Sequence, residues 1–321
     1  MTTAAALPPL AAADVRGARE AKAAVDPWKP LAAWNEEEVA AAGVAVATTV
    51  TLLAGAECPF TCTMCDLWRH TLDGPTPVGA IAAQVAAVGA AVPPAPWIKL
   101  YNASNFFDPR AVPEADLPVI ARLLSDRQRV IVENHPAFCQ PQAAGFARLL
   151  AGRLEVAMGL ETIHPEILPW LGKRMTAADF AAAAGRLRDW EIDVRAFVLL
   201  GLPDLDADAA ADWCLRSLRF AAESGARHVT IIPTRTGNGT FDRLAAAGRF
   251  ATPTAGLVER VLLEALAAPP CIVTVDLWDF ERLAGHCPDC IQPRRERLER
   301  MQRAQASCPS LSPACGCRHD A

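Results

Sequence analysis

The feature that most constrains this chain is a repeated alternation of short, apolar, β-branched runs with longer, alanine-rich stretches. The short runs predict buried strands, and the stretches between them have the length and composition of helices. The predicted strands cover residues 44–54, 97–101, 129–133, 154–160, 194–200 and 229–233. The predicted helices cover residues 78–92, 113–125, 141–151, 176–190 and 206–224.

Repeated strand–helix units imply parallel strands joined by right-handed crossovers. We therefore expect an α/β fold, a (β/α)6 partial TIM barrel, with a doubly wound open sheet as the alternative. The core domain is assigned to residues 44–235, after an N-terminal extension at 1–43. Residues 236–321 form a C-terminal extension with a further strand at 271–276 and a Cys-rich tail. In both folds, ligands bind beyond the carboxyl ends of the strands.

Composition narrows the class of protein. The net charge of −5 argues against a broad nucleic-acid-binding surface. Residues 294–303 carry five arginines against two glutamates, which we interpret first as a solvated helix face and second as an RNA contact. No signal peptide and no membrane-spanning run is recognised, so we expect a cytoplasmic protein without membrane contact. In that compartment the 11 cysteines indicate metal ligands and buried thiols rather than disulfides.

Three of these cysteines follow the first predicted strand directly. The loop reads Cys58-Pro-Phe-Thr-Cys62-Thr-Met-Cys65. Soft thiolate ligands suit iron–sulfur clusters, and three ligands for four irons leave one iron open to a substrate. The alternative is a zinc site with His70 as the nearest fourth ligand.

This CxxxCxxC loop, placed after the first strand of a (β/α)6 chain, resembles the signature of the radical S-adenosylmethionine (SAM) superfamily. The resemblance implies that Cys58, Cys62 and Cys65 ligate a [4Fe–4S] cluster whose fourth iron binds SAM. In that family, reductive cleavage of SAM yields a 5′-deoxyadenosyl radical, with a reductant protein such as flavodoxin or ferredoxin as partner. The residue before the last cysteine is usually aromatic and lies near the adenine. Here it is Met64, which is assigned to the cofactor pocket together with Phe60.

Further segments strengthen the resemblance. The second strand ends at a place where the family often has a Gly-Gly-Glu-like stretch that binds the SAM amino group. Here the glycines are absent, and Asn102 and Ser104 are assigned that role, with a plain polar turn as the alternative. The fifth strand ends in a Gly-Leu-Pro turn at residues 201–203, which in the family borders the adenine and methionine.

The fourth strand runs into a Gly-Leu-Glu-Thr segment similar to that of the branch containing MiaB, HemN and the Elongator catalytic subunit. The resemblance assigns Glu161 to the SAM ribose, and the alternative is an ion pair with Lys173 or Arg174. Arg174 is a candidate for the SAM carboxylate, with Arg195 as its rival. Because a charge within an apolar strand is costly, Arg195 requires a carboxylate partner from the protein or a ligand.

A second group of cysteines lies near the C-terminus. Its members are Cys287, Cys290, Cys308, Cys315 and Cys317, with His286 and His319 as further candidate ligands. They are a candidate site for zinc or for an auxiliary iron–sulfur cluster. The alternative is that some of them are free thiols.

Two classes of function remain from the sequence. The first is a radical SAM enzyme whose compact layout is similar to the archaeosine-synthase radical SAM subunit, which acts on a tRNA base. Its substrate is then either a tRNA base or a small metabolite. The second is a zinc-binding interaction protein without catalysis, which would contain zinc but neither iron nor inorganic sulfide.

Overall fold

Eight strands form one sheet in which strands adjacent in sequence are also adjacent in space. The computed structural model describes residues 7, 10–308 and 317. Its strands are β1 (Ala32–Ala41), β2 (Val44–Leu53), β3 (Trp97–Asn102), β4 (Arg129–Glu133), β5 (Arg153–Glu161), β6 (Asp193–Leu200), β7 (His228–Pro233) and β8 (Ile272–Val275). Strands β2 to β8 are parallel, and β1 is antiparallel to β2. The sheet curls into a nearly closed barrel, which confirms the predicted partial TIM barrel.

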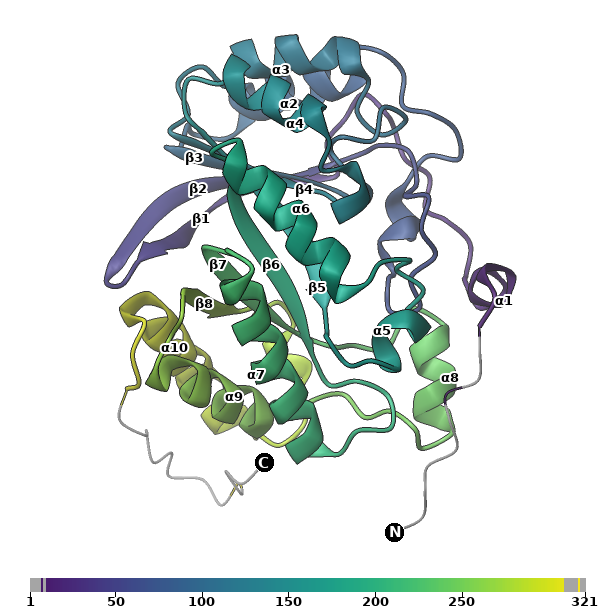
Figure 1. Cartoon of the computed structure of the whole chain (residues 1–321), viewed down its shortest axis with the longest axis vertical. Helices are drawn as coiled ribbons and strands as arrows, with labels where there is room; N and C mark the ends of the chain where they lie inside the picture. Colours follow the sequence, from purple (N-terminus) through teal and green to yellow (C-terminus); the bar gives the residue numbers. More distant parts are fainter. Residues whose placement is uncertain (1–6, 8–9, 309–316, 318–321) are drawn as a thin grey trace.

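Helices cover the outer face of this sheet (Figure 1). The α-helices are α1 (Ala12–Gly17), α2 (Ala80–Ala91), α3 (Leu117–Leu123), α4 (Pro141–Leu149), α5 (Ile167–Trp170), α6 (Ala177–Asp189), α7 (Ala207–Glu223), α8 (Thr240–Ala246), α9 (Ala255–Ala267) and α10 (Pro288–Ala304). Short 3₁₀ turns are η1 (Leu67–His70), η2 (Glu114–Asp116), η3 (Pro136–Phe138) and η4 (Phe280–Arg282). No helix among the described residues has the length and apolar character that crossing a bilayer requires.

Local sequence signals set several of these elements. Thr176 begins α6 as predicted, because its hydroxyl accepts a hydrogen bond from the Asp179 N–H while the Asp179 carboxylate accepts one from the Thr176 N–H. Side chains alternate across each strand. One set packs under the helices as the main core, and the other set points into the barrel, where Trp97, Ile131 and Ala157 form a small apolar layer.

Strand β1 is the strand of the described structure that the sequence did not predict, and the short helices α1 and α5 were not predicted either. The acidic run of β1, with Glu36 and Glu38, is atypical of a strand. The structure explains the run, because both glutamates pair with the buried Lys99 of β3. The residues assigned to an N-terminal extension therefore contribute a strand to the same sheet, while the proposed domain boundaries stay a prediction.

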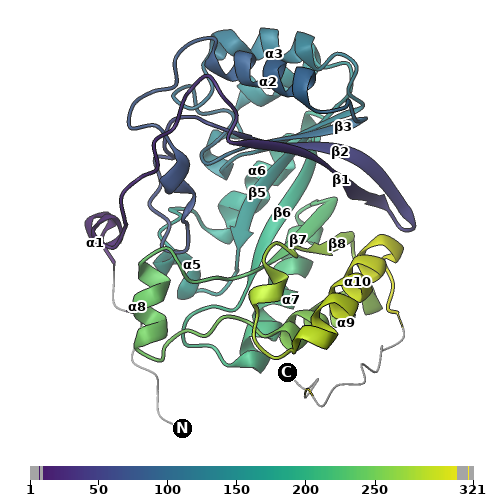
Figure 2. The same ribbon diagram turned by 180° about the vertical axis from the view of Figure 1, so that it is seen from behind.

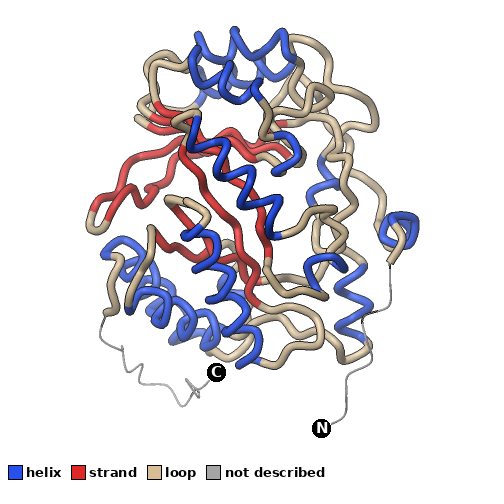
Figure 3. Tube along the Cα trace, viewed as in Figure 1, coloured by secondary structure: helices blue, strands red, loops and turns tan. Residues whose placement is uncertain are grey.

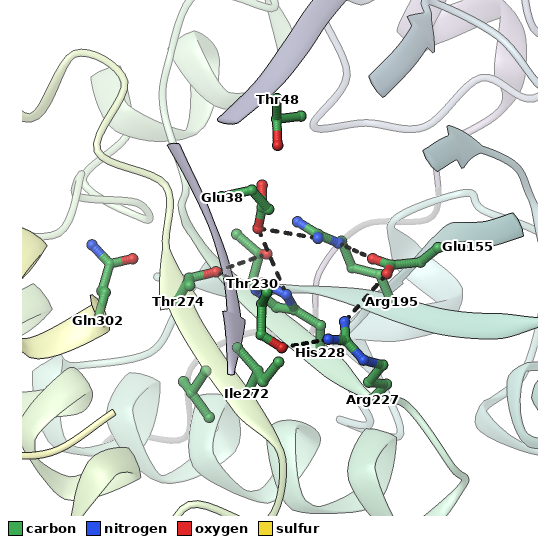
Figure 4. Close-up of polar contacts among 12 residues, drawn as sticks. Glu38, Thr48, Glu155, Arg195, Arg227, His228, Thr230, Ile272, Thr274 and Gln302 are labelled. Atoms are coloured by element: carbon green, nitrogen blue, oxygen red, sulfur yellow. Dashed lines mark hydrogen bonds and ion pairs between the residues drawn. The ribbon is translucent and has the colours of Figure 1, made fainter. Parts of the chain in front are cut away.

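The barrel interior beside β1 is charged rather than apolar. Arg195 donates from Nε to Glu155 Oε1 at 2.7 Å, and its Nη2 lies 3.1 Å from Glu38 Oε1 (Figure 4). All three side chains are almost fully buried. Burial alone would raise the pKa of Glu38, but the charges of Arg195 and Lys99 outweigh it and hold that pKa well below its ordinary value.

Helix α10 covers the open edge of the sheet. Gln302 Oε1 accepts from the Val275 N–H at 2.7 Å, and Gln305 Oε1 accepts from the Val273 N–H at 2.7 Å. These bonds satisfy backbone donors of β8 that would otherwise invite pairing with another chain. The β1–β2 hairpin reaches the same helix, where the Gly43 N–H donates to the Arg303 carbonyl at 2.8 Å (Figure 2).

We expect Glu38→Ala to lower the free energy of unfolding by about 3 kcal/mol, because it removes from the buried charges of Arg195 and Lys99 the carboxylate that they share, leaving Arg195 only Glu155 and Lys99 only Glu36. Glu37→Ala is the matched control, since Glu37 on the same strand pairs with Arg303 at the exposed surface. The control should cost less than about 1 kcal/mol. Urea denaturation measures both values, and equal losses would contradict a stabilising role for the interior network.

Candidate functional site

The Cys58–Cys65 loop follows β2 at the carboxyl end of the sheet, where loops gather (Figure 3). Two neighbouring segments hold it. The Thr63 N–H donates to the Leu171 carbonyl at 2.9 Å, and Trp68 Nε1 donates to the Cys65 carbonyl at 3.1 Å. These contacts within the chain fix the backbone at the second half of the loop.

The three thiols of this loop share one environment. Burial raises the pKa of Cys62 to about 12 and that of Cys65 to about 11, and it also raises the pKa of Cys58. Lys173 opposes the effect at Cys58 and Cys62, and the amide Nδ2 of Asn105 lies 3.4 Å from Cys58 Sγ. The free thiols thus keep their protons at neutral pH, and a metal that binds them must displace those protons.

The spread of the sulfurs bears on the kind of metal site. Among the described residues, the ligand atoms of one group of at least three metal-binding side chains lie within 4.8 Å of one another. This group consists of Cys287, Cys290 and Cys317. The loop cysteines do not form such a set. Thiolates bound to a single zinc ion must lie close together, whereas thiolates on different irons of a cluster stand further apart. The loop therefore fits a cluster better than one zinc ion.

A buried ion pair lies next to these thiols. Lys173 Nζ contacts Glu161 Oε1, and both side chains are about nine-tenths buried. Burial opposes a charge on Lys173, but Glu161 and the neighbouring Cys62 raise the pKa of Lys173. The sequence analysis preferred a ribose contact for Glu161 over this pair. The structure has the pair, which leaves Glu161 Oε2 as the carboxylate oxygen for any further contact.

Backbone geometry makes this pair fit. Glu161 has φ +66° and follows an irregularity in the pairing of β5 with β6. A Cβ on Gly159 would lie 2.0 Å from Glu161 Oε1 and 2.2 Å from Lys173 Nζ, so the pair occupies the space above that glycine. Gly172, with φ +71°, brings the Lys173 segment close to the Thr61 carbonyl of the Cys loop.

His135 is a site residue that the sequence analysis did not single out. Its ring stacks on Phe60 with centroids 3.9 Å apart. Its Nδ1 accepts from the Ala137 N–H at 3.1 Å, so its Nε2 carries the hydrogen and donates to the Lys173 carbonyl at 2.9 Å. Burial and the charge of Lys173 lower the pKa of His135 to about 4, which keeps the ring neutral.

Two more polar residues were not predicted. Asn105 Oδ1 accepts from the His135 N–H at 2.7 Å while its amide reaches Cys58, so Asn105 links β4 to the cysteine loop. Glu133 ends β4, and burial raises its pKa to about 8 although Lys173 opposes the shift. Glu133 is only partly buried by its exposed area, and its raised pKa favours the protonated carboxyl group near neutral pH. Asn105 is a single polar residue after β3, and Glu133 is a single acidic residue at the end of β4. The sequence pattern therefore gave no signal that either of them belongs to the site.

The predicted contact residues at the end of β3 have free hydrogen-bonding capacity. Asn102 is 3% exposed, and within the described residues neither its amide oxygen nor its amide nitrogen has a partner. The buried hydroxyl of Ser104 is likewise without one in that part of the chain. Buried polar atoms are normally paired. These atoms therefore fit a polar ligand at this edge of the sheet, such as the amino group of SAM.

The other predicted residues differ in placement. Met64 packs against an apolar cluster that includes Trp170 and Leu199, and its carbonyl accepts from Asn238 Nδ2 at 3.1 Å. Arg174 is exposed and has φ +55°. The Gly-Leu-Pro turn follows β6, where Gly201 has φ +87°.

Arg195 requires a correction. It is the third residue of β6, so it lies well before the carboxyl end of that strand, and Glu155 and Glu38 supply its carboxylate partners. A strand pattern shows that an arginine is buried but does not show at which height in the barrel it lies. The structure thus argues against Arg195 as a ligand of the SAM carboxylate.

The arginine-rich stretch at 294–303 is also different from the expected solvated face. Arg294 and Arg297 are buried against Glu259, with Arg294 Nε 2.9 Å from Glu259 Oε1. Arg295 pairs with Glu281 and Glu299. Much of this positive charge is therefore used inside the fold.

The C-terminal cysteines divide into two sets. Cys287, Cys290 and Cys317 come together, whereas Cys308 does not join them and packs at the edge of the main core. Cys315 and His319 lie outside the described residues.

Comparison with protein-family models and with curated protein sequences gives no match. Solved structures do match. Archaeal Elp3 from Methanocaldococcus infernus, with an N-terminal deletion, superposes with a TM-score of 0.51 at 15% identity over 81% of this chain and 64% of that chain. Methylornithine synthase (PylB) gives a TM-score of 0.52 at 14% identity over 84% of this chain and 74% of that chain. The radical SAM methyltransferase TsrM from Kitasatospora setae gives 0.43 at 16% identity over 58% and 37%.

The argument from these likenesses rests on the first two. The chain shares its fold with both of these proteins. The chain spans 64% of the length of the Elp3 chain, slightly less than two thirds. At such low identity the likeness establishes the fold, while the reaction must be argued from the site.

We expect Gly159→Ala to destabilise the protein by about 1–3 kcal/mol, because the added methyl group displaces the Glu161–Lys173 pair. Gly145→Ala in α4 is the matched control, since nothing lies within 4 Å of its added carbon. The control should stabilise α4 by about 0.5–1 kcal/mol. Thermal denaturation of the two variants distinguishes them, and a neutral Gly159→Ala would show that the pair needs no space above this glycine.

Proposed function

We propose that this chain is a radical SAM enzyme in which Cys58, Cys62 and Cys65 ligate a [4Fe–4S] cluster. The observation that carries the proposal is the position of these three cysteines, in an ordered loop after β2 at the carboxyl end of a radical SAM fold. When bound, the cluster and SAM together would supply a 5′-deoxyadenosyl radical, with the electron from a flavodoxin or ferredoxin. The protein's own residues bind, orient and shield these groups.

Each polar residue around the loop has a proposed task. Asn102 and Ser104 would bind the SAM amino group through their buried side-chain atoms, which have no partner among the residues that the structure describes. Glu161 Oε2 would accept from a ribose hydroxyl while Oε1 stays with Lys173. Arg174 is the proposed partner of the SAM carboxylate.

Other residues would fix the position of the cluster. Lys173 contributes a positive charge beside Cys58 and Cys62, which favours their thiolate forms once protons leave. Asn105 donates toward Cys58 and thereby lowers the charge on that sulfur. Phe60 and Met64 supply apolar surface on either side of the loop, which would exclude water from the bound adenine.

The substrate is either a small metabolite or a tRNA base. The burial of Arg294 and Arg297 removes the part of the sequence that most suggested RNA contact. Together with the net charge of −5, this favours a small metabolite. Loss of a modified tRNA nucleoside on gene deletion would instead support the tRNA base.

The cluster assignment predicts that Ala in place of Cys58, Cys62 and Cys65 removes the iron and the reaction together. Protein reconstituted without oxygen should bind about four irons per chain, and with dithionite and SAM it should release 5′-deoxyadenosine. The triple variant should fall to background in both measurements. Cys271→Ala is the control, because this half-buried cysteine precedes β8 and should retain both. Full turnover by the triple variant would refute the proposal.

The SAM assignment predicts a separate effect at the end of β3. Asn102→Ala should raise the Kd for SAM by up to about tenfold, the effect of losing one neutral hydrogen bond. The iron content should not change. Asn35→Ala is the control, since Asn35 on β1 bonds to Thr49 and Pro93 instead. Equilibrium binding of SAM to the reconstituted protein measures both, and identical affinities would remove Asn102 from the site.

A further inference from the structure

A second group of thiols lies at the start of α10, away from the cysteine loop. The sulfur atoms of Cys287, Cys290 and Cys317 all lie within 4.8 Å of one another. Cys290 is fully buried, and the other two are partly buried. Cys317 therefore lies beside the CxxC pair of Cys287 and Cys290, although it follows Cys290 by 27 positions in the sequence.

The local structure orients this group. Cys287 is the residue before α10, and Cys290 lies in the first turn of that helix. The Cys287 N–H points at Cys290 Sγ at 3.3 Å, and the Cys290 N–H donates to the Cys287 carbonyl at 3.2 Å. The positive end of the helix dipole favours thiolates at this position. Both sulfurs of the pair are therefore held on one side of the turn, where Cys317 meets them.

The spacing of the sulfurs selects one metal ion over a cluster. Zinc binds thiolates at about 2.3 Å, and in a tetrahedron this places the sulfurs about 3.8 Å apart. Thiolates of an iron–sulfur cubane bind different irons and stand further apart. A set contained within 4.8 Å fits the tetrahedron.

We propose that Cys287, Cys290 and Cys317 bind one structural Zn²⁺, with His286, whose ring nitrogens lie outside the set of atoms within 4.8 Å, turning toward the ion as the fourth ligand. His286 directly precedes Cys287, and both of its ring nitrogens are buried without a hydrogen-bond partner among the described residues. An imidazole in that state has a nitrogen available for a metal. Three thiolates and one imidazole make a closed site of the kind that stabilises a fold rather than catalyses a reaction.

Such an ion would fasten the helix that covers the sheet edge. Helix α10 and the residue after it supply Gln302 and Gln305 to the β8 backbone, and Arg294 of α10 pairs with the buried Glu259 of α9. A metal at the first turn of α10 would join that turn to Cys317, which follows the helix in the sequence. The ion would act through α10 and would be independent of Cys58, Cys62 and Cys65.

Metal analysis of the full-length protein tests the proposal. Purified protein should contain about one zinc per chain, and Cys290→Ser and Cys317→Ser should each lose most of it. Cys308→Ser is the matched control, because Cys308 lies in the same region but outside the group. The variant without Cys58, Cys62 and Cys65 should lose iron and keep zinc, so a failure of the cluster proposal would be seen separately.

Two further measurements make the assignment specific. X-ray absorption at the zinc edge should show three sulfur ligands and one nitrogen, and four sulfurs would remove His286. The Cys317→Ser variant should also unfold at a lower temperature than the Cys308→Ser control. Zinc retained in both Cys290→Ser and Cys317→Ser would overturn the site. Iron and sulfide in this group, in place of zinc, would overturn the choice of metal.

Discussion

The fold depends on a set of charges enclosed by its own barrel. Glu38, Arg195 and Glu155 fill a part of the barrel interior that apolar side chains could also fill. Removing the partner of any one of them would leave a buried charge uncompensated and lower the free energy of unfolding. Since Glu38 comes from β1, the antiparallel edge strand helps to neutralise a charge on β6, five strands further along the sheet. This constraint places the whole β1–β2 hairpin, and through it the contact with α10.

The same principle operates at the other end of the strands, where Lys173 is the connecting charge. Its ammonium group pairs with Glu161 and lies beside Cys62, while its carbonyl accepts from His135. The structure therefore holds a positive charge next to sulfurs whose burial disfavours thiolates. On binding a positively charged cluster, the three thiols would lose their protons and become thiolates. Lys173 would then lie near these negative sulfurs and stabilise them. Position and electrostatics thus agree on one site.

Sequence patterns predicted the strands well because buried parallel strands are continuous apolar runs, and the cysteine loop because its spacing is itself the chemical signal. They failed for β1, whose glutamates face inward to meet charges on distant strands. They misplaced Arg195, because burial in a strand is readable from sequence but height in the barrel is not. His135 and Asn105 were missed because their roles exist only once β4 and the loop lie side by side. Pairings across the sheet carry no local signature.

The two cysteine groups are alike in composition but differ in the spacing of their sulfur atoms. Both are groups of mostly half-buried thiols in one chain, and their number alone allowed zinc or iron–sulfur chemistry at either place. The C-terminal sulfurs lie within the reach of a single tetrahedral ion, while those of the loop after β2 do not. Near the loop, side-chain atoms of Asn102 and Ser104 have no partner within the part of the chain that the structure describes, which suits a second ligand. The C-terminal group instead lies at the start of a helix that covers the edge of the sheet. Sulfur spacing and surroundings together support the reaction proposed for the first group and the structural role proposed for the second.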